Sequence, residues 1–235
     1  MNVIITGATG FVGSEVVRQA IAAWRIRHAF VLTRKPLPEE FSKCDKITIV
    51  EHSDFSVYPP ELLEKLAGAE ACIWTIGGRA PQFPNVETAR KVSVDYTIAA
   101  AKAFLADLAP RLSEGRKFRF LFCSGKYAEW DDDKHLLFMA DTRHIKGQVE
   151  KGLCSLADCH KENLEIFIVR PGGISSKGNR VKVKLGNLVG FISVDDLAKD
   201  MIHILVNGYR ERIIENDVLL KLHDFGQPEE SKLVP

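Results

Sequence analysis

The stretch Gly7-Ala8-Thr9-Gly10-Phe11-Val12-Gly13 decides the fold of this chain. It follows a short apolar run, residues 2–6, and opens an amphipathic segment, residues 14–24. Glycines at this spacing between a strand and a helix permit a tight turn, close approach of the backbone to a pyrophosphate, and close helix packing. The pyrophosphate is expected at the N-terminus of the helix. The stretch therefore predicts a dinucleotide site formed by Gly7, Thr9, Gly10, Phe11, Val12 and Gly13.

The rest of the chain alternates apolar runs of strand length with helical patterns. Strands are expected at residues 2–6, 29–33, 47–50, 71–76, 118–123, 165–169 and 218–222, and helices at 14–24, 60–67, 86–108, 136–156 and 194–206. Strands that are apolar throughout lie in a parallel sheet with helices on both faces, and right-handed crossovers make such a sheet doubly wound. We therefore predict an α/β fold, a Rossmann-type doubly wound parallel sheet.

The whole chain, residues 1–235, is expected to form a single domain, because no linker or repeat interrupts the alternation. The least regular stretch lies around residues 175–190 and is rich in Gly, Lys and Ser. A minimal substrate lobe is expected there. Within it, Val181-Lys182-Val183-Lys184 alternates as a strand with one basic face does.

Composition excludes several classes of protein. The net charge of +1 gives no overall field toward nucleic acid or an anionic membrane, and no apolar run approaches the ~20 residues of a membrane span. The first expected strand begins at Asn2, which leaves no room for a targeting peptide. We expect a cytoplasmic protein with neither nucleic acid nor membrane as a partner. The five cysteines lack metal-ligand spacing, so no metal site is expected.

The end of the second expected strand selects between nicotinamide cofactors. An acidic residue at this place would bind the ribose 2′-hydroxyl of NAD. The chain has Thr33-Arg34-Lys35 instead, and Arg34 and Lys35 can pair with a 2′-phosphate. The other interpretation is a solvated basic turn. The sequence thus predicts NADP(H), with NAD(H) as the alternative.

With these features, the sequence resembles the short-chain dehydrogenase/reductase superfamily, in its extended or atypical branch, over nearly the whole chain. The opening Thr6-Gly7-Ala8-Thr9-Gly10-Phe11-Val12-Gly13 is similar to the TGxxGxxG of that branch. Further similar segments are Ser53-Asp54-Phe55, where the family reads adenine, Thr75-Ile76-Gly77-Gly78, Val92-Ser93-Val94-Asp95-Tyr96, and Arg170-Pro171-Gly172-Gly173. The resemblance implies that the cofactor is bound by Asp54, Phe55, Thr75, Ile76, Gly77, Pro171, Gly172 and Gly173.

Within this branch, the segment Lys146-Gly147-Gln148-Val149-Glu150 is similar to the K-G-x-V-E of the Tat-interacting-protein oxidoreductase-like group, whose neighbours are related to NmrA. The resemblance implies that Lys146 holds the nicotinamide ribose. It also implies an oxidoreductase that can pair as a homodimer through its long helices.

The chain departs from the family at the catalytic pair Tyr-x-x-x-Lys. Lys146 matches the lysine, but Thr142 stands four residues earlier, and its aliphatic hydroxyl is a far weaker acid than a phenol, which titrates near ~10. The family's serine corresponds to Ser124, or in another register to Gly125. Tyr127, just past the same strand, is another candidate acid. The candidate catalytic residues are Ser124, Tyr127, Thr142 and Lys146.

Two functions fit these residues. The first is an NADPH-dependent reductase of a carbonyl, enone or imine in a small organic substrate, in which the Ser124 or Thr142 hydroxyl polarises the substrate. The second is a protein that binds NADP(H) without redox chemistry, as a sensor or regulator, or as an isomerase or cyclase. The absence of the tyrosine favours the second function, and the lysine is compatible with both.

Overall fold

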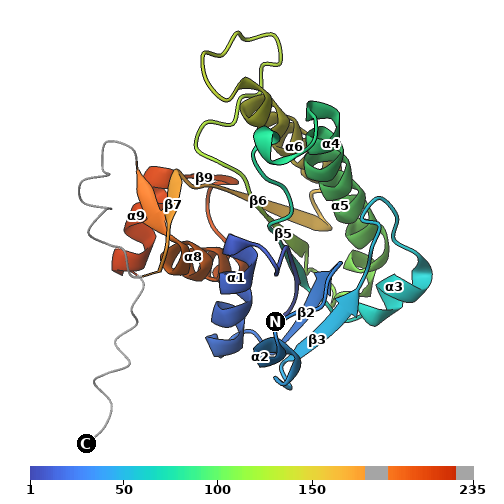
Figure 1. The fold of residues 1–235 in the computed structure, drawn as a ribbon. Helices are drawn as coiled ribbons and strands as arrows, with labels where there is room; N and C mark the ends of the chain where they lie inside the picture. Colours follow the sequence, from blue (N-terminus) through green and yellow to red (C-terminus); the bar gives the residue numbers. More distant parts are fainter. Residues whose placement is uncertain (178–189, 226–235) are drawn as a thin grey trace, which may run out of the picture.

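The computed structural model describes residues 1–177 and 190–225. Seven strands form one parallel sheet in the order β3-β2-β1-β4-β5-β6-β9 (Figure 1). The order reverses between β1 and β4, where ligands of doubly wound sheets bind at the carboxyl ends of the strands. The predicted Rossmann-type α/β fold is confirmed. The strands are β1 Asn2–Thr6, β2 His28–Thr33, β3 Ile47–Glu51, β4 Ala71–Trp74, β5 Phe118–Cys123, β6 Leu164–Arg170 and β9 Ile213–Glu215.

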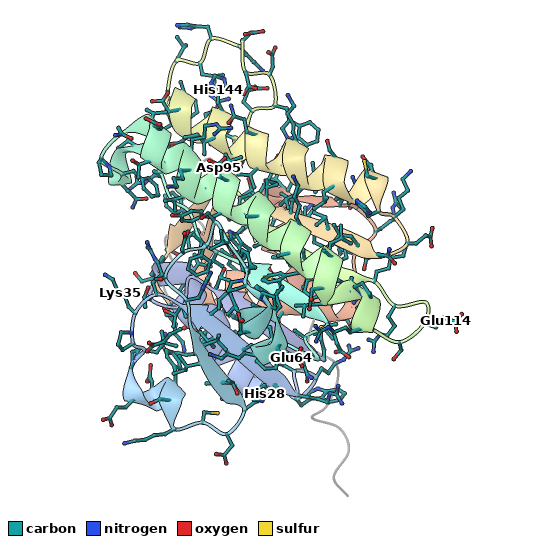
Figure 2. All side chains as sticks on the ribbon, turned by 90° about the vertical axis from the view of Figure 1, so that its right-hand side faces the viewer. His28, Lys35, Glu64, Asp95, Glu114 and His144 are labelled. Atoms are coloured by element: carbon teal, nitrogen blue, oxygen red, sulfur yellow. The ribbon has the colours of Figure 1, made fainter. Side chains whose placement is uncertain are left out.

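Helices cover both faces of the sheet. Figure 1 shows α1, α8 and α9 on one side and α3, α4, α5 and α6 on the other, and Figure 2 shows α5 and α6 lying side by side. The helices are α1 Phe11–Ala22, α2 Glu39–Ser42, α3 Pro60–Lys65, α4 Val86–Arg90, α5 Tyr96–Asp107, α6 Ala140–Cys159, α8 Val194–Asn207 and α9 Asn216–Phe225. Among these described helices, none combines the length and apolarity that crossing a membrane requires.

The strands are apolar throughout because their side chains are buried in two separate hydrophobic cores, one on each face of the sheet. In β1, Ile4 belongs to the core under α5 and α6, whereas Val3 and Ile5 belong to the core under α1 and α8. In β5, Phe120 and Leu121 divide between the two cores in the same way. Successive side chains of a strand point to opposite faces, so burial of both faces requires an uninterrupted apolar run.

The last predicted strand is wrong. Residues 218–222 lie inside the helix α9, and the strand at this edge of the sheet is β9, a few residues earlier. A five-residue apolar run fits either a strand or the buried stripe of a helix, and Leu219 is fully buried on that stripe. The three residues of β9 are too few to give a pattern of their own.

Two predicted helices have different bounds or regularity. The helix expected at residues 86–108 is interrupted by a π-helical turn, Lys91–Asp95, between α4 and α5. Residues 136–156, which were expected to contain a helix, hold most of α6; the helix begins at Ala140, because Met139 adopts a left-handed conformation with φ of +50°. The π-helical turn and the left-handed residue interrupt the regular α-helical backbone, but the spacing of apolar residues in the sequence does not show them.

A second, two-stranded parallel sheet pairs β7 Gly173–Ser175 with β8 Phe191–Ser193. The sequence did not predict this pair. It brackets the expected substrate lobe, but residues 178–189, which include Val181-Lys182-Val183-Lys184, lie outside the described residues.

Candidate functional site

The loop between β1 and α1 is packed so closely that two of its glycines have no room for a side chain. Gly7 has φ of +72°, and a Cβ atom there would lie 2.3 Å from Thr75 Oγ1. A Cβ atom on Gly13 would lie 2.1 Å from the carbonyl oxygen of Gly7. The backbone N–H of Gly10 donates to that same oxygen over 2.8 Å. The first turn of α1 is therefore held directly against the ends of β1 and β4.

The N-terminus of α1 is free to bind an anion. Gly10 is the N-cap residue and, within the described chain, no side chain caps the helix and no acidic residue stands in its first turn. The first N–H groups of a helix lack partners within the helix, and together with the helix dipole they favour a phosphate. Phe11, Val12 and Thr9 surround this terminus. The residues present thus fit the pyrophosphate of a dinucleotide.

The two basic residues after β2 are exposed. The side chains of Arg34 and Lys35 have no hydrogen bond or ion pair to another described residue. The turn itself is fixed by Thr33, whose hydroxyl donates to the Lys35 carbonyl over 2.9 Å. Figure 2 labels Lys35, which lies at the rim of the structure. Both side chains are therefore available to pair with an anion at the end of β2.

The segment after β3 places its two predicted cofactor residues differently. Asp54 is exposed and accepts hydrogen bonds from the Ser56 hydroxyl and backbone N–H over 2.5 and 2.9 Å, which lower the pKa of its carboxyl group. The Phe55 ring is buried and packs edge to face on Trp74, with 5.8 Å between ring centroids. Asp54 is thus an ionised acceptor at the surface, whereas the Phe55 side chain belongs to the core.

Lys146 lies at the carboxyl ends of β4 and β5. Its Nζ donates to the Cys123 carbonyl over 3.1 Å and lies 5.0 Å from the centroid of the Phe122 ring. Burial lowers the pKa of Lys146. The ammonium group also lies 4.0 Å from the place where a Cβ atom on Gly77 would be, and Gly77 has φ of +134°. Because Gly77 has no side chain, there is room beside the Lys146 ammonium group for a ligand atom that accepts its remaining hydrogen bonds.

Ser93 is a residue that the sequence did not single out. It lies in the π-helical turn, and its Oγ is 3.4 Å from the same Cβ position of Gly77. This oxygen is buried and has no hydrogen-bond partner in the described structure. Such turns inside α-helices are frequent at functional sites, but no residue pattern reveals them in a sequence. The structure thus adds an unpaired hydroxyl to the surroundings of Lys146.

The Ser124 hydroxyl is held by a buried carboxylate. It donates to Glu150 Oε1 over 2.5 Å, and the indole N–H of Trp130 donates to Glu150 Oε2 over 2.6 Å. Arg170 donates to both oxygens, and Glu150 is fully buried. The proton of Ser124 is thus committed to Glu150, and only its oxygen remains available. At the other candidate register, Gly125, a Cβ atom would meet no described atom within 4 Å.

The other two predicted hydroxyls lie in different surroundings. Thr142 is buried, and its Oγ1 accepts a hydrogen bond from the Ala80 backbone N–H over 2.9 Å. Tyr127 is 46% exposed, and its ring lies edge to face with Phe138 at 5.5 Å between centroids. The Arg143 guanidinium lies over the Phe138 ring at 4.8 Å. Thr142, in the first turn of α6, therefore contacts the segment that follows β4, whereas Tyr127 belongs to an exposed aromatic cluster.

The remaining predicted cofactor residues follow β4 and β6. The Thr75 hydroxyl donates to the Thr6 carbonyl over 2.7 Å, which ties the ends of β4 and β1 together, and Ile76 packs against the core. The Pro171 carbonyl accepts from the Lys126 N–H over 2.8 Å, and the Gly172 N–H donates to Asn216 Oδ1 over 2.6 Å. Gly173 begins β7. The predicted cofactor residues therefore come from the loops after β1, β2, β3, β4 and β6.

Comparison with known proteins gives distant relatives. No family model matches the chain. A leucinostatins biosynthesis cluster protein T of Purpureocillium lilacinum is 30% identical over 177 residues, which cover 75% of this chain but only 59% of that protein. The mitochondrial protein FMP52 of Candida albicans is 26% identical over 195 residues, covering 80% of this chain and 76% of that protein.

Solved structures agree more closely in fold than in sequence. A 3-oxoacyl-[acyl-carrier protein] reductase from Brucella melitensis superposes with a TM-score of 0.71 at 14% identity, covering 94% of this chain and 97% of that one. ElxO with NADP bound has a TM-score of 0.67 at 15% identity, covering 93% and 98%. MoeE5 in complex with UDP-glucose and NAD has a TM-score of 0.67 at 16% identity, covering 91% and 75%. The chain therefore has the Rossmann-type fold found in solved short-chain dehydrogenases/reductases.

Proposed function

We propose that this protein is an NADP(H)-dependent oxidoreductase that reduces a carbonyl, enone or imine in a small organic substrate. The observation that carries the proposal is the position of Lys146 beside Gly77, at the same sheet edge as the glycine loop and the free N-terminus of α1. The sequence resemblance to the atypical short-chain dehydrogenases/reductases, and to their Tat-interacting-protein and NmrA-like groups, supports it. So do the reductase and the NADP-bound protein among the structures of similar fold.

Each part of the site has a distinct task in this proposal. The glycine loop and the first turn of α1 bind the pyrophosphate, and Arg34 and Lys35 bind the 2′-phosphate. Lys146 donates to the nicotinamide ribose hydroxyls while one of its N–H groups stays hydrogen-bonded to the Cys123 carbonyl. The nicotinamide, when bound, supplies the hydride. What the chain must add is a hydrogen-bond donor for the substrate oxygen or nitrogen.

Thr142 is the hydroxyl that can supply this hydrogen bond. Its oxygen accepts from the Ala80 N–H, so its own proton remains available to a ligand. Ser124 is oriented in the opposite sense, because its hydroxyl already donates its hydrogen bond to Glu150. In the proposed reaction, Thr142 therefore polarises the substrate by hydrogen bonding, and the proton that completes the reduction comes from water.

The second candidate is a protein that binds NADP(H) without redox chemistry, as a sensor or regulator, or as an isomerase or cyclase. The hydrogen bonds of Ser124 and Thr142 favour it. The Ser124 hydroxyl donates to the Glu150 carboxylate, and the Thr142 oxygen accepts from the neutral Ala80 N–H. Within the described residues, neither hydroxyl is therefore hydrogen-bonded to a cation that would make it a stronger acid. Under this proposal Lys146 serves cofactor binding alone.

The two candidates separate when cofactor binding and turnover are measured on the same protein. NADPH binding is titrated by fluorescence, and oxidation is followed at saturating NADPH with a panel of aldehydes, ketones, enones and imines. A reductase oxidises NADPH with at least one substrate class, and Lys146→Ala abolishes this turnover. The exposed lysine of α5, Lys102, gives the matched control, since Lys102→Ala should change neither quantity. Tight binding without oxidation supports the second candidate, and no binding refutes both.

We further propose that the protein acts in the cytoplasm on a small organic substrate and pairs as a homodimer through its long helices. The C. albicans relative carries the word mitochondrial in its name, so subcellular fractionation with antibody detection is a necessary test. Recovery in a mitochondrial fraction would overturn the cytoplasmic proposal. Sedimentation of the purified protein tests the dimer.

A further inference from the structure

A hollow lies on the outer surface of α6, where the helix meets β9. Its volume is about 410 Å³, within the range of small-molecule sites. It is lined by Trp130, Lys151, Cys154, Ser155, Asp158, Arg212 and Ile213. This hollow shares none of its lining residues with the proposed cofactor site.

Trp130 lines this hollow and is 37% exposed. Its indole N–H donates to the buried Glu150 Oε2 over 2.6 Å, which fixes the ring. A fixed aromatic ring costs little conformational entropy when a second ring stacks on it. The hollow therefore offers a preformed surface for a planar ligand.

Two cations and one carboxylate, Lys151, Arg212 and Asp158, line the hollow. Lys151 Nζ donates to the Trp130 backbone carbonyl over 3.0 Å, a neutral partner, and no carboxylate in residues 1–177 or 190–225 forms an ion pair with it. Arg212 pairs with Asp158 over 2.9 Å and also lies near the Cys154 carbonyl, at 3.4 Å. Of the two cations that line the hollow, Lys151 is thus left without a carboxylate partner among the described residues, and its ammonium group lies on the Trp130 backbone.

We propose that this hollow binds a small aromatic carboxylate, whose ring stacks on Trp130 and whose carboxylate pairs with Lys151. This site goes beyond the proposed function and does not depend on it. The Lys151 ammonium group already lines the hollow, where the Trp130 backbone carbonyl holds it. It can therefore form a charge-assisted hydrogen bond to a carboxylate without a large rearrangement. A cationic or neutral aromatic compound lacks this second interaction.

Isothermal titration calorimetry of the full chain tests the proposal with 2-naphthoate and 2-naphthamide, which share their rings and differ in charge. NADP⁺ is present at saturation, so that the dinucleotide site does not compete; if no NADP⁺ binds, the titration is done without it and remains valid. We expect naphthoate to bind with a dissociation constant of about 0.1–1 mM and naphthamide to bind about tenfold more weakly. Equal binding of the two compounds, or no heat with either, overturns the proposal.

Variants locate the binding. Lys151→Gln should weaken naphthoate binding about tenfold and leave naphthamide unchanged. Trp130→Ala should remove binding of both, and Trp130→Phe, which keeps a ring, guards against misfolding of the alanine variant. Trp24 is the matched control, because it is 79% exposed and lies beside Arg25 at 5.9 Å, far along the chain. If Trp24→Ala weakens binding as much as Lys151→Gln does, the assigned site is wrong.

Discussion

Alanine at Gly13 should damage both the stability of the protein and its cofactor binding. The new Cβ atom would lie 2.1 Å from the Gly7 carbonyl oxygen, 2.4 Å from the Gly7 carbonyl carbon and 2.7 Å from Thr75 Oγ1. Two of these atoms belong to the backbone, so α1 or the loop must move away from the strand ends. Such a movement displaces the N–H groups that are proposed to bind the pyrophosphate.

The size of the effect follows from two opposing contributions. Overpacking a closely packed site costs about 1–3 kcal/mol, whereas alanine is favoured over glycine inside a helix by about 1 kcal/mol. We therefore expect a net loss of up to about 2 kcal/mol in the free energy of unfolding, which lowers Tm by up to about 8 °C for a chain of this size. The affinity for NADPH should fall at least about tenfold, which corresponds to ~1.4 kcal/mol.

Two other glycines provide graded controls. A Cβ atom on Gly10 would meet a single atom, the Gly7 carbonyl oxygen, at 3.2 Å, and one on Gly125 would meet no described atom within 4 Å. Gly10→Ala should thus have an intermediate effect, and Gly125→Ala should leave Tm unchanged or slightly raised. Tm is measured by circular dichroism without cofactor, and NADPH affinity by fluorescence titration. If Gly13→Ala binds NADPH as the wild type does and melts at the same temperature, the steric reasoning is refuted.

Three further predictions concern the cofactor, the hydroxyls and a buried carboxyl. Arg34→Ala should weaken NADPH binding about tenfold and leave NADH binding unchanged, because only the 2′-phosphate pairs with the guanidinium; parallel titrations with the two cofactors decide this. Thr142→Val should lower turnover at least about tenfold, whereas Ser124→Ala should mainly lower stability, by about 1–2 kcal/mol, as measured by urea unfolding; the reverse pattern would contradict the assignment. Burial raises the pKa of Asp200 to about 8 from its ordinary value of 3.8, so the folded state retains a proton that the unfolded state releases. The resulting stabilisation is complete below pH 3.8 and is lost as the pH rises toward 8. The free energy of unfolding of Asp200→Asn, relative to that of the wild type, should therefore rise by up to about 4 kcal/mol from pH 4 to pH 7. A constant difference across this range, measured by urea unfolding, would refute it.

The parts of the fold that could be predicted are those in which sterics or double burial restrict the choice of residue. The positions of Gly7 and Gly13 tolerate no Cβ atom, so the loop is visible in the sequence as a fixed spacing. The central strands are buried on both faces, so they stand out as apolar runs. Lys146 was singled out through its resemblance to a family motif, and its ammonium group lies at the carboxyl ends of β4 and β5.

The parts that could not be predicted depend on contacts between distant residues. Residues 218–222 lie in the helix α9, but a short, mostly apolar run fits a strand equally well, so the sequence does not distinguish the two. The orientation of Ser93 depends on a π-helical turn, and the hydrogen bond from Ser124 depends on Glu150, which comes from α6 rather than from its own strand. Each of these is a tertiary interaction with no local signal in the sequence.

The replacement of the expected tyrosine by Thr142 limits which reductions the proposed site can perform. A hydroxyl of this kind can hydrogen-bond to a substrate atom but cannot transfer a proton at neutral pH, since its pKa lies far above that of a phenol. Reduction of a simple ketone needs a proton at oxygen as the hydride arrives, so the loss of the acid should slow it most. An iminium ion already carries its proton, and a conjugated enone can take its proton at carbon from water. The retention of Lys146 together with the loss of the acid therefore favours imines and enones over simple carbonyl compounds as substrates of the proposed reductase.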